Sequence, residues 1–190
     1  SSGFNGGIEV MLANYVRYTN LNHIFVFVWD KGPNYDWIVE QGFKTYFLDC
    51  HSKGPLKTAR SAIAIARNED PAVIVTHHGN AYVRFLGELA RKNTSKKIHY
   101  YYSHSDCFSQ VLVSDGFKSK ILNTLNKYCI KKATKIIAIS EAVKKSIHEC
   151  YGIDYNKIVT IYNGADIKSF DYPPHIKEDT IHIAYAGRLV

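Results

Sequence analysis

Strand and helix patterns alternate along this chain of 190 residues, and this alternation is the feature that most restricts its fold. Runs rich in β-branched and aromatic residues predict strands over the ranges 23–30, 43–49, 72–78, 97–104, 134–140 and 157–166. Apolar residues at helical spacing predict helices over 55–70, 80–93, 115–133 and 141–152, and a turn is expected at 31–34. Strands that alternate with helices form βαβ units. The sequence therefore predicts an α/β fold with a mostly parallel sheet and helices on both faces.

The composition is that of a globular domain with an excess of positive charge. Hydrophobic residues make up 46% of the chain and charged residues 22%, so a sizeable core can form. The net charge of +7 favours anionic partners such as phosphorylated ligands or an acidic membrane surface. There is no nucleic-acid-binding motif and no apolar run near the roughly 18 residues of a membrane span. The four cysteines lack CxxC spacing, which favours reduced thiols in a cytoplasmic protein.

Both ends of the sequence depart from this strand–helix order. A glycine-rich loop over residues 3–7 runs into an amphipathic helix near Ile8, with no strand before it. In a doubly wound sheet such a loop follows the first strand, so we expect that strand to be missing. Residues 171–180 are polar and carry two prolines, whereas residues 181–190 again have a strand pattern. We therefore expect a domain over 1–170, a linker over 171–180 and the first strand of a second domain over 181–190.

Histidines lie where two of the predicted strands end. His77 and His78 end the predicted strand at 72–78, His104 ends the predicted strand at 97–104, and Asp106 lies two residues beyond it. Ligands bind outside the carboxyl ends of strands in open parallel sheets, and a histidine there can carry a proton or donate to a ligand oxygen. A structural role for each histidine is the simplest alternative. A metal site is a further alternative, although no HxH or HExxH spacing supports it.

Other candidate residues occupy further turns. Gly6 and Gly7 precede a helix whose first amides can bind phosphate, although their spacing matches neither common phosphate-binding motif. Ser140 can line a site or can simply cap the helix that follows it. Asn163 and Gly164 can line a site or can simply form a turn, because both residue types tolerate positive φ. Arg188, which ends the last strand pattern, suits an anionic leaving group such as a diphosphate.

Taken in order, these segments resemble the amino-terminal half of a GT-B glycosyltransferase of glycosyltransferase family 4. The segments that carry the resemblance are NGGIEVML, VIVTHHG, YYYSHSD, ATKIIAISEAVKKSI, KIVTIYNGADIKSF and IAYAGRLV. Each motif is degenerate alone, but the series follows family order and spacing over nearly the whole chain. The stretch from Ala133 to Arg188 is the most specific part.

The resemblance implies an enzyme with two Rossmann-like domains that face each other across a cleft. Such enzymes transfer a sugar from a nucleotide-sugar, such as a UDP-, GDP- or dTDP-sugar, to an acceptor hydroxyl. They do so with retention at the anomeric carbon and without an essential metal. The amino-terminal half mostly binds the acceptor, here expected to be a glycan or a lipid-linked glycan for a surface polysaccharide or glycolipid. Because most of the donor-binding half is absent, we expect the isolated chain to have little or no transferase activity.

The resemblance also assigns roles to particular residues. Gly6 and Gly7 match a glycine loop whose backbone approaches the donor phosphates, and Arg188 matches the arginine that neutralises the departing diphosphate. His104 matches the histidine at the reaction centre. Either His77 or His78 matches the turn that faces the acceptor.

Two other functions fit the same residues. A non-catalytic Rossmann-like domain that binds a nucleotide or phosphosugar has the same fold, because fold does not determine function. A metal-dependent hydrolase using the two strand-end histidine groups is the third possibility. For the transferase we expect a cytoplasmic location, with peripheral contact to the inner face of the membrane where a lipid-linked acceptor lies.

Overall fold

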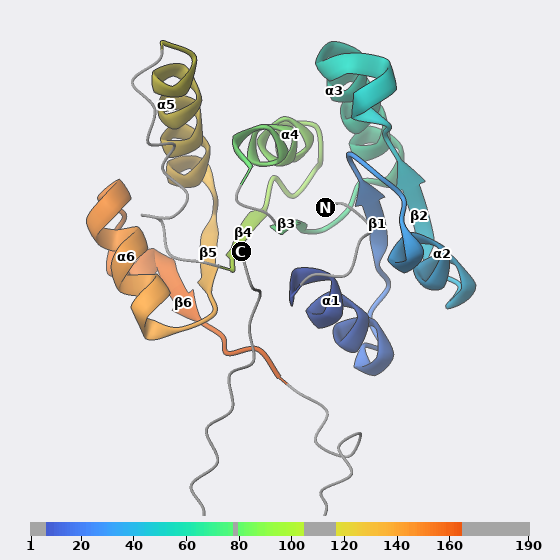
Figure 1. The fold of residues 1–190 in the computed structure, drawn as a ribbon, viewed down its shortest axis with the longest axis horizontal. Helices are drawn as coiled ribbons and strands as arrows, with labels where there is room; N and C mark the ends of the chain where they lie inside the picture. Colours follow the sequence, from blue (N-terminus) through green and yellow to red (C-terminus); the bar gives the residue numbers. More distant parts are fainter. Residues whose placement is uncertain (1–6, 78–79, 105–116, 165–190) are drawn as a thin grey trace, which may run out of the picture.

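The computed structural model describes residues 7–77, 80–104 and 117–164 (Figure 1). Its strands are β1 (Ile24–Phe27), β2 (Lys44–Phe47), β3 (Ile74–His77), β4 (His99–Ser103), β5 (Lys135–Ala138) and β6 (Ile158–Thr160). Its helices are α1 (Gly7–Tyr18), α2 (Pro33–Glu40), α3 (Cys50–Glu69), α4 (Ala81–Lys92), α5 (Phe117–Lys132) and α6 (Glu141–Tyr151), with the 3-10 turn η1 (Tyr155–Lys157). The six strands predicted between residues 23 and 166 are all present, although each is shorter than its sequence pattern. The predicted linker over 171–180 and the strand predicted over 181–190 lie outside the described residues.

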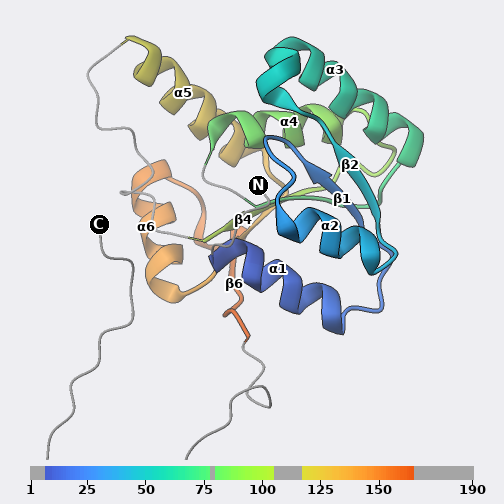
Figure 2. The same ribbon diagram turned by 45° about the vertical axis from the view of Figure 1, so that its right-hand side comes forward.

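Every pairing among the described strands is parallel, which confirms the predicted α/β fold with a parallel sheet. The strands form two groups, β1-β2 and β3-β4-β5-β6, and no hydrogen-bonded ladder joins β1 to β3 within the described residues. Helices α1 and α2 lie on one side of the strands, and α3, α4 and α5 lie on the other (Figures 1 and 2). The division of the sheet was not predicted.

The helix ends follow from local chemistry. Asn80 caps α4 by accepting a hydrogen bond from the Tyr82 amide at 2.8 Å, and Gly152 ends α6 with a φ of 61°. The turn expected at 31–34 is confirmed only in part, because α2 begins inside it at Pro33, directly after Gly32. Pro33 fits the first helical turn because its missing N–H has no partner there. Helix α3 begins earlier than predicted and bends at Gly54, where φ is 73°.

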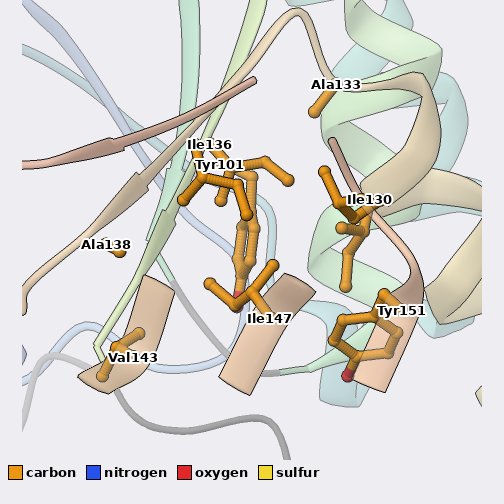
Figure 3. Close-up of a cluster of buried hydrophobic side chains, with 10 residues drawn as sticks. Tyr101, Ile130, Ala133, Ile136, Ala138, Val143, Ile147 and Tyr151 are labelled. Carbon is orange, nitrogen blue, oxygen red and sulfur yellow. The ribbon is translucent and has the colours of Figure 1, made fainter. Parts of the chain in front are cut away.

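The main apolar core lies between the four-stranded group and helices α5 and α6. Figure 3 shows Tyr101 and Ile136 pointing from the strands toward Ile130 of α5 and Ile147 of α6. All four side chains are at most 2% exposed. Each such burial contributes about 1.5–3 kcal/mol, so this core fixes the position of β4 and β5.

Beside this core, polar groups are buried in pairs. Arg84 of α4 donates to the Asn126 side-chain oxygen and to the Tyr101 hydroxyl, and its guanidinium lies 4.2 Å from the centre of the Tyr101 ring. The imidazole Nε2 of His99 lies 2.9 Å from the Thr76 hydroxyl. His99 and Tyr101 alternate with Tyr100 and Tyr102 along β4, so this strand turns one set of residues toward the helices and the other set away.

Gly87 of α4 touches the Thr76–His99 pair, and its replacement by alanine is expected to lower the free energy of unfolding by about 1–3 kcal/mol. An added Cβ would lie 2.4 Å from Thr76 Cγ2 and 2.8 Å from His99 Nε2. Urea denaturation of the purified chain measures the loss, and Gly164→Ala is the matched control because a Cβ there meets nothing within 4 Å. Adding Thr76→Ser, which removes Cγ2 and keeps the hydroxyl, restores part of the loss. Equal stability of Gly87→Ala and the control contradicts the packing shown here.

Two further sequence expectations concern cysteines and membrane spans. Cys50 and Cys129 are buried free thiols, as expected. Cys150 takes part in a disulfide, so the expectation of reduced thiols is wrong for that residue. Among the described residues, no helix is both long and apolar enough to cross a membrane.

Candidate functional site

Three aromatic rings gather where β3 and β4 end. His77 is the last residue of β3 and is the register partner of Tyr102 on β4, and His104 comes directly after β4, two residues beyond Tyr102. The three side chains lie on the same side of the sheet because residues two apart on a strand point the same way. We call His77, Tyr102 and His104 the ring cluster.

The rings of the cluster stack on one another. The Tyr102 ring lies between the two imidazoles, with its centre 5.1 Å from that of His77 and 4.6 Å from that of His104. The planes are tilted by only 23° and 15°. The Nδ1 atom of His77 also lies 3.3 Å from Nε2 of His104, so one of these ring nitrogens donates to the other. Stacking and this hydrogen bond together hold His104 at the sheet edge.

The surroundings keep His77 neutral. Burial, together with the nearby His104, lowers the pKa of His77 from 6.5 to about 3. Burial likewise raises the pKa of the Tyr102 hydroxyl. Neutral His77 therefore presents one donor and one acceptor, which suits a role in orienting His104.

The imidazole NMR signals of His77 are expected to stay unchanged as the pH falls from 7 to about 4.5. The imidazole in the urea-unfolded chain is the control and titrates near its ordinary value of 6.5. Between these two pKa values the unfolded chain binds a proton that the folded chain does not. The free energy of unfolding therefore falls as the pH decreases below 6.5. A folded-state midpoint near 6.5 for His77 contradicts this prediction.

Asn163 lies next to the ring cluster, whereas Ser140 caps a helix. The Tyr102 hydroxyl is 3.5 Å from both the Ile161 carbonyl oxygen and the Asn163 side-chain oxygen, within reach of a weak hydrogen bond. The Ser140 hydroxyl accepts from the Val143 amide at 3.2 Å and so caps α6. Gly164 makes no close approach, since an added Cβ meets nothing within 4 Å.

Several predicted site residues lie outside the described residues: Gly6, His78, Asp106 and Arg188. Gly7 is the first residue of α1. The structure thus brings His77 and His104 together, places Asn163 beside them, and leaves the phosphate-binding and metal-binding hypotheses untested.

Tyr102 was missed by the sequence analysis. It sits in a run of three tyrosines that reads as an ordinary strand, and nothing marks its middle or last member as special. The usable signal is the alternation of side chains along the strand. Tyr102 is two residues before His104, so both side chains lie on the same face, and Tyr102 is the register partner of His77. The strand register, which pairs Tyr102 with His77, sets its ring beside both histidines.

A family model described as Glycosyltransferase Family 4 matches residues 5–169. Among curated proteins, none matches this sequence significantly.

Solved structures with a similar fold come from Anabaena. The crystal structure of Alr3699/HepE in complex with UDP superposes with a TM-score of 0.65 at 18% identity, over 88% of this chain and 43% of that chain. The structure of the same protein with UDP and glucose gives a TM-score of 0.68 at 17% identity, over 92% and 45% respectively. The present chain therefore spans less than half of the length of these structures.

Proposed function

Because this chain belongs to glycosyltransferase family 4, we propose that it forms the acceptor-side half of a sugar-transferring enzyme. The reaction moves a sugar from a nucleotide-sugar to an acceptor hydroxyl, with retention at the anomeric carbon and without an essential metal. A UDP-sugar is the first donor to test, because the structurally similar Alr3699/HepE was crystallised with UDP and with UDP and glucose. The acceptor is a glycan or a lipid-linked glycan.

The ring cluster is the observation that carries this proposal. It lies at the carboxyl edge of a parallel sheet, where ligands of open α/β folds bind. His104, held by the Tyr102 ring and by His77, offers an imidazole N–H to an oxygen of the transferring sugar. In this role the cluster orients the sugar while the diphosphate departs.

The departing diphosphate needs positive groups. In the proposed enzyme, the backbone amides at the start of α1, next to Gly7, face the phosphates, and Arg188 approaches from the donor side. These amide and guanidinium groups are in place before charge develops on the phosphate oxygens, so they stabilise the transition state electrostatically. This role rests on the family assignment, since Gly6 and Arg188 lie outside the described residues.

The test is a transfer assay with the intact polypeptide that carries this chain. UDP-, GDP- and dTDP-sugars are supplied with glycan and lipid-linked acceptors, with and without a metal chelator, and the anomeric configuration is read by proton NMR. Transfer with retention in the presence of chelator supports the proposal. Donor binding without transfer or hydrolysis favours the non-catalytic binding domain, and hydrolysis that stops with chelator favours the metal-dependent hydrolase.

We further propose that α5 brings the enzyme to the inner face of an anionic membrane. Its described residues carry Lys120, Lys127, Lys131 and Lys132 and no acidic side chain, and Ile121 and Tyr128 on the same helix are 51% and 46% exposed. Lysines beside exposed apolar and aromatic side chains suit a lipid surface. Co-sedimentation with vesicles that requires anionic lipid supports this contact, and equal binding to neutral vesicles contradicts it.

A further inference from the structure

A second group of rings lies where β1 and β2 end, apart from the ring cluster. Trp29 comes two residues after β1, and His51 is the second residue of α3, which follows β2. The centres of these two rings are 5.2 Å apart, and their planes are inclined by 49°. The ring of Tyr82, in the first turn of α4, has its centre 5.8 Å from that of Trp29. We call Trp29, His51 and Tyr82 the aromatic platform.

The main chain fixes His51 beside Trp29. Pairing between the two chains continues past the ends of β1 and β2, because the Cys50 amide donates to the Val28 carbonyl at 2.9 Å. Asp49 then turns the chain into α3 with a φ of 54°, in the left-handed region. Residues other than glycine keep such a conformation where the surrounding structure holds them, and they are common at functional sites. The neighbourhood of the two rings is therefore set by the backbone as well as by side-chain packing.

Trp29 is held from two sides and still reaches the surface. Trp29 and Tyr82 both pack against the apolar cluster that includes Leu48 and Val83. The Tyr82 hydroxyl donates to the Pro55 carbonyl at 2.6 Å, which fixes the Tyr82 ring next to the indole. Trp29 nevertheless remains partly exposed. A partly exposed indole in a fixed position is a suitable surface for the flat apolar face of a ligand.

Polar groups border the indole. Asp30 follows Trp29 directly, and its Oδ1 atom lies 3.9 Å from Nε2 of His51, which is too long for a hydrogen bond. The His51 and Asp30 side chains are 65% and 41% exposed. A carboxylate accepts hydrogen bonds, and a neutral imidazole both donates and accepts one. A ligand that covers the indole can therefore form hydrogen bonds with both side chains at its edge.

These groups match the chemistry of a sugar. A pyranose has an apolar face of C–H groups, which stacks on an aromatic ring, and a rim of hydroxyls, which donate to a carboxylate. A nucleobase also stacks on an indole, but the Asp30 carboxylate repels the phosphates of a nucleotide. We propose that Trp29, Asp30 and His51 form a subsite for one sugar unit of a neutral glycan acceptor.

The subsite lies near the candidate reaction centre but does not include it. Tyr82, which contacts Trp29, is only five residues after His77 of the ring cluster. An acceptor glycan that spans both places has its reacting hydroxyl at the ring cluster and an earlier sugar unit on Trp29. The subsite therefore favours oligosaccharide acceptors over monosaccharides. The choice of an acceptor glycan as the ligand rests on the proposed transferase function.

Binding tests the subsite without any transfer reaction. The intact polypeptide that carries this chain is applied to an array of neutral pyranose oligosaccharides, and calorimetry gives the affinity for the best-bound member. We expect Trp29→Leu to lower this affinity by about tenfold or more. His51→Ala and Asp30→Asn each lower it by about threefold or more.

Matched variants separate a lost contact from a general disturbance. Trp37→Leu removes the other tryptophan, which lies on α2 beside Arg17, and Lys57→Ala truncates another exposed side chain of α3. Both variants should bind the oligosaccharide as the unchanged protein does. If Trp29→Leu fails to fold, the exposed positions of His51 and Asp30 still decide the result.

Kinetics then show whether the bound glycan is an acceptor. The three subsite variants should raise KM for oligosaccharide acceptors, while kcat and the KM for a monosaccharide acceptor stay unchanged. Oligosaccharide binding that depends on Trp29, in a protein without transferase activity, contradicts the proposed function and leaves the subsite in place.

Three results overturn the subsite itself. The first is that the intact polypeptide binds no oligosaccharide of the array. The second is that the Trp29, His51 and Asp30 variants bind the best oligosaccharide as tightly as the unchanged protein. The third is that Trp29→Leu weakens the binding of UDP and not of the oligosaccharide, which assigns the indole to the nucleobase.

Discussion

Replacing His104 with alanine in the intact polypeptide is expected to lower kcat/KM for sugar transfer by about 100-fold or more. A positioned imidazole that donates to a reacting oxygen contributes on the order of 10²–10⁴ in rate. The loss should lie mainly in kcat, because the proposed contact strengthens as charge redistributes in the transition state. Initial rates with the best donor measure the effect.

Two sets of variants make this result specific. His148→Ala is the matched control, since His148 lies in the last turn of α6 and bonds to the Ile153 carbonyl at 2.7 Å, away from the ring cluster. Tyr102→Ala should also lower kcat, because the ring between the two imidazoles is lost. Tyr102→Phe, which keeps the ring, should recover most of that activity. Unchanged turnover of His104→Ala removes His104 from the site.

Replacing Arg84 with alanine is expected to lower the free energy of unfolding by about 4 kcal/mol. Arg84 is 1% exposed and donates to Asn126 of α5 and to Tyr101 of β4, so it joins α4 to both elements. Truncation leaves a cavity worth about 2–5 kcal/mol and also removes donors from buried oxygens, at about 1–3 kcal/mol each. The cavity cost and the hydrogen-bond cost do not add in full, because neighbouring side chains relax into the space that Arg84 leaves. Such a loss is a large fraction of the 5–15 kcal/mol typical of a domain.

Urea denaturation followed by circular dichroism measures this change. Arg60→Ala, at an exposed position of α3, is the matched control and should stay within about 0.5 kcal/mol. Arg84→Met keeps the length of the side chain and should lose less than alanine does, because filling the space offsets part of the loss. A change below about 1 kcal/mol for Arg84→Ala contradicts the contribution assigned to this network.

The sequence pattern predicts the order of elements well but not their pairing. Strands such as β3 and β5 are recognisable because buried parallel strands are continuous apolar runs. Helix α2 was missed because Gly32 and Pro33 give the same signal for a turn and for a helix start. The division of the sheet depends on which distant edges meet, and no local pattern records that.

The candidate site was predicted in the same partial way. His77 and His104 were found because each lies at the end of a strand, and topology brings the ends of parallel strands together. Tyr102 and the Thr76–His99 pair escaped notice because their roles depend on strand register. Whether a residue of β4 faces the helices or the ring cluster is fixed by where the strand pairs, and Tyr101 and Tyr102 look alike in the sequence.

The alternation along β4 makes stability and specificity separately adjustable. Residues at odd positions, His99, Tyr101 and Ser103, pack into the protein interior, whereas Tyr100 and Tyr102 face the other way. Substitutions at the even positions can reshape the candidate site while the interior stays intact. Insertion or deletion of a single residue within β4 exchanges the two sets at once. We therefore expect variation along this strand to arise by substitution, with its length held constant.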